Sequence, residues 1–223
     1  MMNSVFVTGT DTEVGKTRIS VALIELLQQQ GEKVVGMKPI ASGCELMGDG
    51  LRNDDALKLI QQAKVSLPYE LINPYAFEPA IAPHIAAKQE GVTIDLERIK
   101  QNFDVIQSQS DSVVVEGAGG WLVPLNEHTS MADLAVRLGL PIVLVVGIRL
   151  GCINHALLTV QAIEKSGLQL QGWVANNIEE NAESIEIVNT LKQGISAPCL
   201  GVVPLLSVEE KATAYLTLEN SND

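Results

Sequence analysis

A short apolar stretch, Val5-Phe-Val7, leads into a turn that begins at Gly9 and ends in Gly15-Lys16-Thr17. An amphipathic helix is predicted to start there. Such a turn directs successive backbone N–H groups inward, and the helix adds unpaired N–H donors and the positive end of its dipole. The lysine can reach the terminal phosphates of a nucleotide, and the threonine hydroxyl can ligate Mg²⁺. The stretch therefore predicts a phosphate-binding loop.

The spacing of this loop departs from the usual pattern. Four residues normally separate the two glycines, whereas Gly9 and Gly15 enclose five, residues 10–14. The alternative interpretation is an incidental Gly-Lys-Thr at a helix start. A strand before the loop and a helix after it are the context that nucleotide binding requires, so we favour a variant nucleotide loop.

Other polar residues follow predicted strands, at the edge where a parallel sheet binds its ligands. Lys38 and Ser42 come after the second strand, and Glu116 ends the third. An acid at the end of a strand suits Mg²⁺, and the glycines that follow Glu116 allow close approach to a ligand. Glu116 could instead be a plain surface carboxylate, and the position of Lys38 does not by itself distinguish a functional lysine from an exposed one. Further positions at this edge are Gly117, Ala118, Gly119, Asn176, Asn177, Pro204, Leu205 and Leu206.

The hydrophobic pattern alternates between strands and helices along the whole chain. Runs such as 142–146 are apolar throughout, as strands buried on both faces must be, so we predict a doubly wound α/β fold with a mostly parallel sheet and helices on both faces. We expect a loop at 41–50 and an irregular segment at 66–83, which carries four prolines. The expected strands are 33–38, 112–116, 141–146, 170–176 and 199–203, and the expected helices after the first are 53–63, 84–90, one centred on 96–106, 130–138, 153–166, 182–194 and a last stretch before a polar tail.

Composition limits the class of protein. With 223 residues and 46% apolar content, we expect a single domain over 1–223. With a net charge of −12, we expect no broad basic surface that could bind nucleic acid or an anionic membrane. Cys44, Cys152 and Cys199 have neither disulfide-framework nor zinc spacing, and no apolar run is long enough to span a bilayer, so we expect a cytoplasmic protein.

Several segments together resemble the dethiobiotin synthetases, in that family's order and over about residues 4–206. The five-residue loop spacing is also that family's spacing. The segments are Gly9-Thr-Asp-Thr-Glu-Val-Gly-Lys-Thr17, Lys38-Pro-Ile-Ala-Ser-Gly43, Gly50-Leu-Arg-Asn-Asp-Asp55, Asn73-Pro-Tyr75, Val115-Glu-Gly-Ala-Gly-Gly-Trp121, Val145-Val-Gly147, Leu150-Gly-Cys-Ile-Asn-His155 and Gly172-Trp-Val-Ala-Asn176.

The resemblance implies a P-loop NTPase-like homodimeric ligase that converts 7,8-diaminononanoate, carbon dioxide and ATP to dethiobiotin, ADP and phosphate with Mg²⁺. It implies that Thr17, Asp55 and Glu116 hold the metal and that Lys38 and Lys16 are catalytic. The remaining nucleotide contacts that it implies are Thr12, Glu13, Val14, Gly15, residues 117–119, Asn176, Asn177 and residues 204–206. The implied substrate contacts are Thr12 and Ser42, with Gly151, Cys152, Ile153 and Asn154 from the neighbouring subunit.

Two other classes remain as alternatives. A partitioning-type nucleotide-switch ATPase has a similar loop, but it carries a signature lysine where this chain has Asp11, and no basic amphipathic tail is present. An amide-forming synthetase for a cobalamin-like substrate would usually need an added glutaminase domain with a Cys and His pair, for which the chain has no room.

Overall fold

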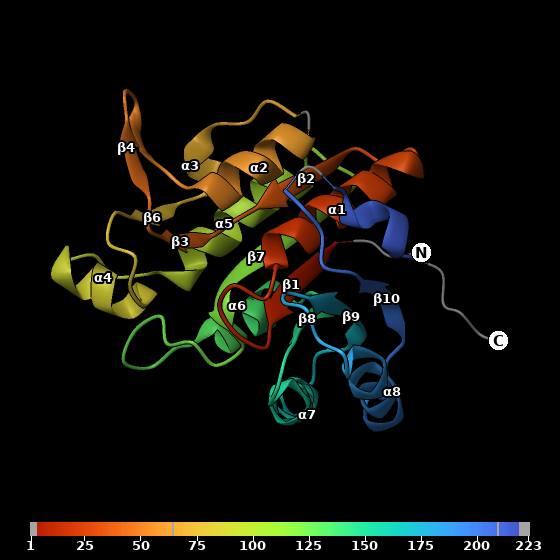
Figure 1. The fold of residues 1–223 in the computed structure, drawn as a ribbon. Coiled ribbons are helices and arrows are strands. Elements are labelled where there is room, and N and C mark those ends of the chain that lie inside the picture. The colour runs from red at the N-terminus through yellow and green to blue at the C-terminus, as the bar shows by residue number, and fades with distance from the viewer. Residues whose placement is uncertain (1–3, 64, 209, 219–223) are drawn as a thin grey trace.

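The apolar runs form the central sheet of the computed structural model, which describes residues 4–63, 65–208 and 210–218 (Figure 1). Six parallel strands lie in the order β10-β9-β8-β1-β7-β2. This arrangement confirms the predicted doubly wound α/β class. The strands are β1 (Val5–Gly9), β2 (Val34–Met37), β7 (Ser112–Gly120), β8 (Ile142–Ile148), β9 (Leu170–Asn177) and β10 (Cys199–Val203).

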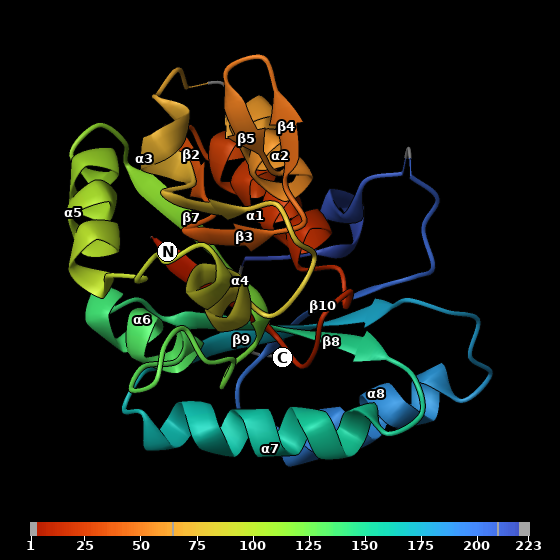
Figure 2. The ribbon, with the colours of Figure 1, turned by 90° about the vertical axis from the view of Figure 1, so that its left-hand side faces the viewer.

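Alternate side chains of each strand enter the cores on opposite faces of the sheet. Val5 and Val7 pack with Leu23 of α1 (Lys16–Gln29), whereas Phe6 between them packs with Phe103 of α5 (Leu96–Gln107). Helices α1 (Lys16–Gln29) and α2 (Asp54–Ala63) cover the first face. The opposite face carries α5 (Leu96–Gln107), α6 (Met131–Leu138), α7 (Cys152–Lys165) and α8 (Ser184–Gly194) (Figure 2).

Residues close to each other in the sequence set the ends of two helices. Ser130 and Asp133 form a reciprocal capping box at the start of α6, which satisfies two N–H groups that the helix leaves unpaired. Gly31, just beyond α1, has a φ of 91°, a conformation that glycine adopts without strain.

Two segments expected to lack regular structure contain short elements instead. The 41–50 segment begins within β3 (Ile40–Ser42). It continues into an antiparallel hairpin of β4 (Glu45–Met47) and β5 (Gly50–Arg52). The 66–83 segment holds α3 (Tyr69–Ile72) and β6 (Tyr75–Phe77), which pairs with β3, and it leads into α4 (Pro83–Gln89). These strands have only three residues each, too few to show a periodic pattern, so the prediction of a loop and an irregular segment was wrong.

The excursion between α2 and α4 is tied to the end of β2. Lys38 N donates to Ile72 O at 3.0 Å, and Asn73 Nδ2 donates to Lys38 O at 2.6 Å. Asn73 is almost completely buried. The backbone of Lys38 is therefore held from both directions, which positions its side chain at the edge of the sheet.

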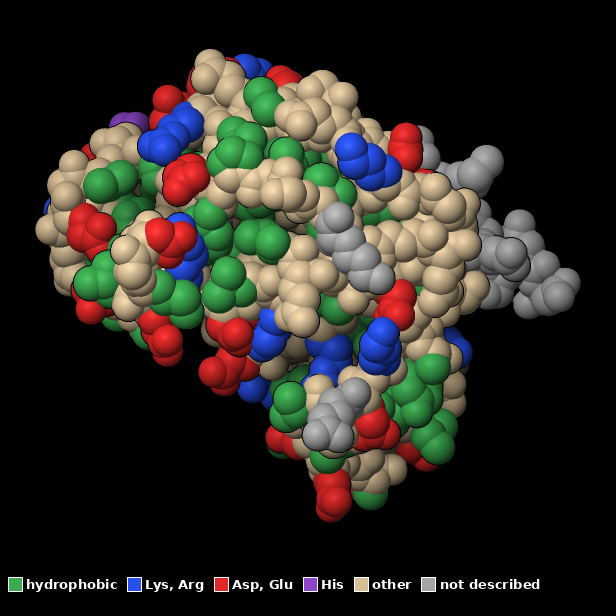
Figure 3. Space-filling view, turned by 90° about the horizontal axis from the view of Figure 1, so that it is seen from above, with side chains coloured by type: hydrophobic (Ala, Val, Ile, Leu, Met, Phe, Trp, Pro, Cys, Tyr) green, Lys and Arg blue, Asp and Glu red, His purple; other side chains and the backbone are tan. Residues whose placement is uncertain are grey.

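The last predicted helical stretch is a short 3₁₀ helix, η1 (Ala212–Tyr215), and the polar tail 219–223 lies outside the described residues. Within the described part of the chain, every helix is too short or too polar to cross a membrane. On the face shown in Figure 3, acidic and apolar side chains are interspersed with basic ones.

Candidate active site

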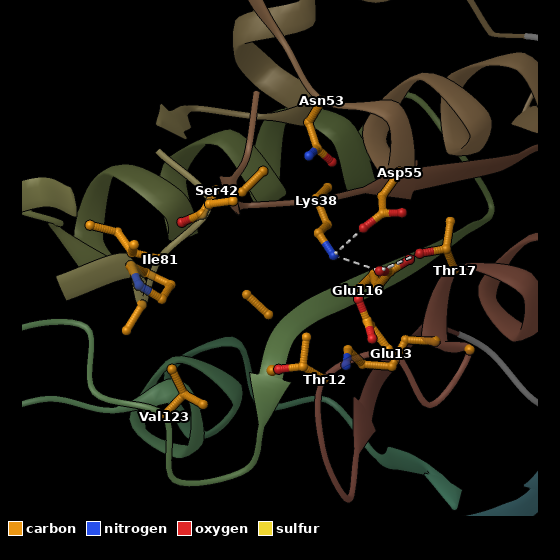
Figure 4. Close-up of a pocket in the computed structure, with 18 residues that line it drawn as sticks. Thr12, Glu13, Thr17, Lys38, Ser42, Asn53, Asp55, Ile81, Glu116 and Val123 are labelled. Atoms are coloured by element: carbon orange, nitrogen blue, oxygen red, sulfur yellow. Dashed lines mark hydrogen bonds and ion pairs between the residues drawn. The ribbon is translucent and has the colours of Figure 1, made fainter. Parts of the chain in front are cut away.

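A cavity of about 760 Å³ opens beyond the carboxyl ends of β1, β2 and β7 (Figure 4). Its walls come from the phosphate-binding loop, the ends of β2 and β7, the start of α2 and the segment before α4. The lining residues are Thr12, Glu13, Gly15, Lys16, Thr17, Lys38, Ala41, Ser42, Asn53, Asp55, Ala80, Ile81, Ala82, Pro83, Glu116, Ala118, Gly119 and Val123.

The loop between β1 and α1 turns sharply because two of its residues have a positive φ. Gly15 has a φ of 90° and Glu13 a φ of 60°, both in the left-handed region. A Cβ on Gly15 would lie 2.2 Å from Asn176 Nδ2, so this position requires glycine for space as well as for conformation. Asn176 Nδ2 also donates to Val14 O at 2.9 Å, and this bond ties the loop to the end of β9.

Lys16 lies at the floor of the loop, and its Nζ donates to Asp11 O at 2.8 Å. Its side chain is buried. Burial, together with repulsion from Lys38, lowers the pKa of Lys16 to about 8. The group therefore carries most of its charge at neutral pH and sits where the terminal phosphates of a nucleotide are expected.

The ammonium group of Lys38 is surrounded by acceptors. Its Nζ lies 2.5 Å from Glu116 Oε1, 3.2 Å from Asp55 Oδ2 and 3.2 Å from Gly117 O (Figure 4). Thr17 Oγ1 donates to the same Glu116 oxygen at 2.9 Å. The structure thus brings four predicted site residues from β1–α1, β2, α2 and β7 into one hydrogen-bonded cluster.

The charges of this cluster shift each other's pKa values. Burial alone would lower the pKa of Lys38, but attraction to Glu116 and Asp55 outweighs burial and raises it. Burial alone would raise the pKa of Asp55, and attraction to Lys38 with a hydrogen bond from Thr17 lowers it instead. Both groups are therefore charged at neutral pH.

The donor set fits a magnesium ion that travels with a nucleotide. Glu116 is 1% exposed, and its Oε2 atom has no hydrogen-bond partner among the described residues. A buried carboxylate oxygen without a partner is costly unless something else binds it. The described residues contain no group of three or more His, Cys, Asp or Glu that could hold a metal ion. Two carboxylates and a hydroxyl nevertheless suit Mg²⁺, which usually takes one or two carboxylates together with phosphates and water.

Several predicted residues lie outside the lining of this cavity in the described part of the chain. Gly151 is the N-cap of α7 and has a φ of 88°, and the 151–154 segment contributes nothing to the walls. Asn177 Nδ2 donates to Val203 O at 2.8 Å, so it braces β10. The predicted residues that do not line the cavity are Val14, Gly117, Gly151, Cys152, Ile153, Asn154, Asn176, Asn177, Pro204, Leu205 and Leu206.

One wall of the cavity consists of residues that no sequence pattern predicts. Residues 80–83 lie in the segment expected to be irregular, and Val123 follows β7 without a pattern of its own. Asn53 also lines the cavity, and the resemblance implies no role for it. Its Oδ1 accepts from Ala56 N at 3.2 Å, which starts α2 beside the cavity. Asn53 is the first residue of the helix predicted over 53–63, and the structure places it just before α2, where Asn is a typical cap.

Comparisons with known proteins identify the family and the fold of the chain. A family model described as an AAA domain matches residues 3–213. The chain is 50% identical over 208 residues to an ATP-dependent dethiobiotin synthetase of Pseudomonas paraeruginosa, covering 92% of this chain and 91% of the relative. Over 216 residues it is 50% identical to that of Cellvibrio japonicus, covering 96% of this chain and 95% of the relative.

Among solved structures, the chain is similar to the MinC:MinD cell division protein complex of Aquifex aeolicus, with a TM-score of 0.57, 16% identity, and coverage of 92% of this chain and 82% of that one. It is also similar to MinD complexed with Mg-ADP from Pyrococcus horikoshii, with a TM-score of 0.55, 14% identity and the same coverage. These likenesses show a P-loop NTPase fold. With half of its residues identical to relatives of matching length, the chain belongs to the ATP-dependent dethiobiotin synthetase family, the ligases of biotin biosynthesis.

Proposed function

We propose that this protein uses ATP to close the ureido ring of dethiobiotin from 7,8-diaminononanoate and carbon dioxide, releasing ADP and phosphate. The observation that carries the proposal is the buried cluster of Lys38, Glu116, Asp55 and Thr17 next to the phosphate-binding loop. Family membership supports the substrate. We further propose that residues 1–223 act as one ATP-binding domain, supported by a sheet whose strands come from both ends of the chain.

Each chemical step handles negative charge. One amine adds carbon dioxide and loses a proton to give a carbamate. A carbamate oxygen attacks the γ-phosphate, ADP leaves, and a carbamic-phosphoric anhydride forms. The second amine then attacks the carbamoyl carbon, and phosphate leaves as the ring closes. This chemistry needs positioning and electrostatic stabilisation rather than a protein nucleophile.

The two buried lysines provide that stabilisation. Lys16 faces the terminal phosphates, and Lys38 faces the carbamate and the transferring phosphoryl group. When bound by Thr17, Asp55 and Glu116, Mg²⁺ would neutralise charge on the phosphate oxygens. All three N–H donors of Lys38 now go to Glu116, Asp55 and Gly117. Metal binding to the two carboxylates would compete with Lys38, so the two donors that now go to Glu116 and Asp55 would become available to the carbamate.

We propose a homodimer in which 151–154 of one subunit receives the substrate carboxylate of the other. Cys152 N already donates to Arg149 O at 3.1 Å, but the positive end of the dipole at the start of α7 suits a carboxylate. A second cavity, of about 440 Å³, includes Thr12, Leu122 and Leu158 in its lining, and both leucines are more than half exposed. An apolar surface beside the site supports burial against a second subunit.

The test is phosphate release with Mg²⁺ and bicarbonate, measured with and without 7,8-diaminononanoate, while mass spectrometry follows dethiobiotin in the same tube. We expect phosphate and dethiobiotin to form together and only with the diamine. Lys38→Gln should lower the rate by roughly 10²–10³. Unchanged turnover in this variant would remove Lys38 from the catalytic role.

The alternative is a nucleotide-switch ATPase of the partitioning type, which shares this fold. Equal ATP turnover without the diamine, and no dethiobiotin, would favour it. Asn154→Ala tests the dimeric substrate site separately, because it should weaken diamine binding and leave ATP binding unchanged.

A further inference from the structure

Arg18 joins the first turn of α1 to a loop that is 188 residues away in the chain. Its guanidinium group donates to Leu206 O at 3.1 Å and to Ser207 O at 3.0 Å. Arg18 directly follows Thr17, so its helix turn begins at the phosphate-binding loop. A planar guanidinium that spans two successive carbonyls fixes both the position and the orientation of the loop.

The other end of the same loop is also held. Asn177 Nδ2 donates to Val203 O at 2.8 Å, at the last residue of β10. Ser207 N donates to Glu210 Oε2 at 2.9 Å, which closes the loop on its far side. The backbone of 204–206 is therefore fixed on both sides by hydrogen bonds from side chains.

The segment between these anchors lies next to the first turn of α1, which follows the phosphate-binding loop. Leu205 is 51% exposed, while Leu206 is nearly buried in the core that α1 forms with the sheet. Pro204 restricts the backbone further because its φ is fixed by the ring. A rigid, exposed apolar surface suits the flat face of a nucleotide base, and a loop fixed before binding loses less entropy when the base binds.

We propose that Arg18 is a positioning residue for the nucleotide base, holding the 204–207 loop where it contacts the base of ATP. The proposal rests on the proposed use of ATP. It adds a role that the phosphate-binding motif does not contain, since Arg18 lies one position beyond Gly15-Lys16-Thr17. Arg18 touches the loop, and its effect on the base is exerted through Leu206 and Ser207.

The test compares a ligand that has a base with one that lacks it. Isothermal titration calorimetry of the full chain would use Mg-ATP and Mg-tripolyphosphate as ligands. For Arg18→Met we expect the Kd for ATP to rise about fivefold or more, an estimate from the cost of ordering a released loop. The Kd for tripolyphosphate should stay within about twofold, because the phosphate-binding loop is unchanged.

Two further variants act as references. Arg18→Lys keeps the charge but cannot span two carbonyls, so its ATP affinity should lie between those of the parent and Arg18→Met. Lys211→Met removes the ion pair between this exposed lysine and Glu25, a second link between α1 and the segment after the loop. Glu25 keeps its hydrogen bond from Thr213, so both ligands should bind Lys211→Met as they bind the parent.

Hydrogen exchange followed by mass spectrometry tests the same idea without a ligand. Arg18→Met should increase exchange in 204–207 and leave 9–17 unchanged. Equal weakening of ATP and tripolyphosphate, or unchanged affinity and exchange, would overturn the proposal. If Arg18→Met does not fold, the same comparison with Arg18→Lys decides. A protein that makes no dethiobiotin but shows the selective loss of ATP affinity would refute the proposed reaction and leave the role of Arg18 intact.

Discussion

Lys38 Nζ lies 2.5 Å from Glu116 Oε1, and both side chains are at least 95% buried. The pair joins the end of β2 to the neighbouring strand β7, across 78 residues of sequence. Removing either partner leaves an uncompensated charge in the interior, which is more costly than removing both. This relationship makes the stability of the fold depend on the same residues that we propose for catalysis.

The first prediction concerns this pair. Lys38→Met and Glu116→Gln should each lower the free energy of unfolding by about 3 kcal/mol, and the double variant should lose clearly less than the sum. Urea denaturation measures all three. Lys58→Met is the control, because its ion pair with Asp54 is exposed and should contribute less than about 0.5 kcal/mol. Additive losses would show that the two charges do not interact.

The second prediction concerns the metal. Asp55→Asn removes one of the two carboxylates that we propose for Mg²⁺, so the Mg²⁺ concentration needed for half-maximal ATP binding should rise about tenfold or more. Titration of Mg²⁺ at fixed ATP gives this value. The neighbouring Asp54→Asn is the matched control, since the Asp54 side chain is exposed and pairs with Lys58. An equal response of the two variants would argue against Asp55 as a ligand.

The third prediction concerns pH. Burial raises the pKa of the Cys44 and Cys199 thiols above their ordinary value of 9.0. Both should react slowly with a disulfide reagent at pH 8 in the folded protein and fast in urea, because the thiolate is the reactive form. The unfolded state loses these protons first as pH rises through about 9, so stability should fall there. Rapid labelling of the folded protein at pH 8 would contradict the prediction.

The fourth prediction concerns a glycine in the core. A Cβ on Gly36 would lie 2.7 Å from Leu59 Cβ and 2.9 Å from Ile24 Cδ1, where α1 and α2 pack on β2. Gly36→Ala should therefore lower the free energy of unfolding by about 1–3 kcal/mol. Gly48→Ala, in the β4–β5 hairpin, meets nothing within 4 Å and serves as the control. Thermal melting of both variants decides, and similar melting temperatures would contradict the packing argument.

Features that depend on neighbouring residues could be predicted from the sequence. The phosphate-binding loop is contiguous from Gly9 to Thr17, and the apolar runs of the central strands signal burial on both faces. The cap of α6 at Ser130 also lies within four residues of its partner. These signals were sufficient for the α/β class and for Lys16, Thr17 and Glu116 as candidates. Lys38 needed the family resemblance as well, because its position alone was not decisive.

The features that only the tertiary structure decided depend on the order of strands in the sheet. Strand β7 lies between β1 and β2, so Glu116 meets Thr17 on one side and Lys38 on the other. The tertiary structure also places residues 80–83 on the cavity wall and brings Arg18 into contact with residues 206–207. Local sequence carries helix and strand preferences. Which strands become neighbours is decided by burying all their faces at once, and no short stretch of the chain contains that information.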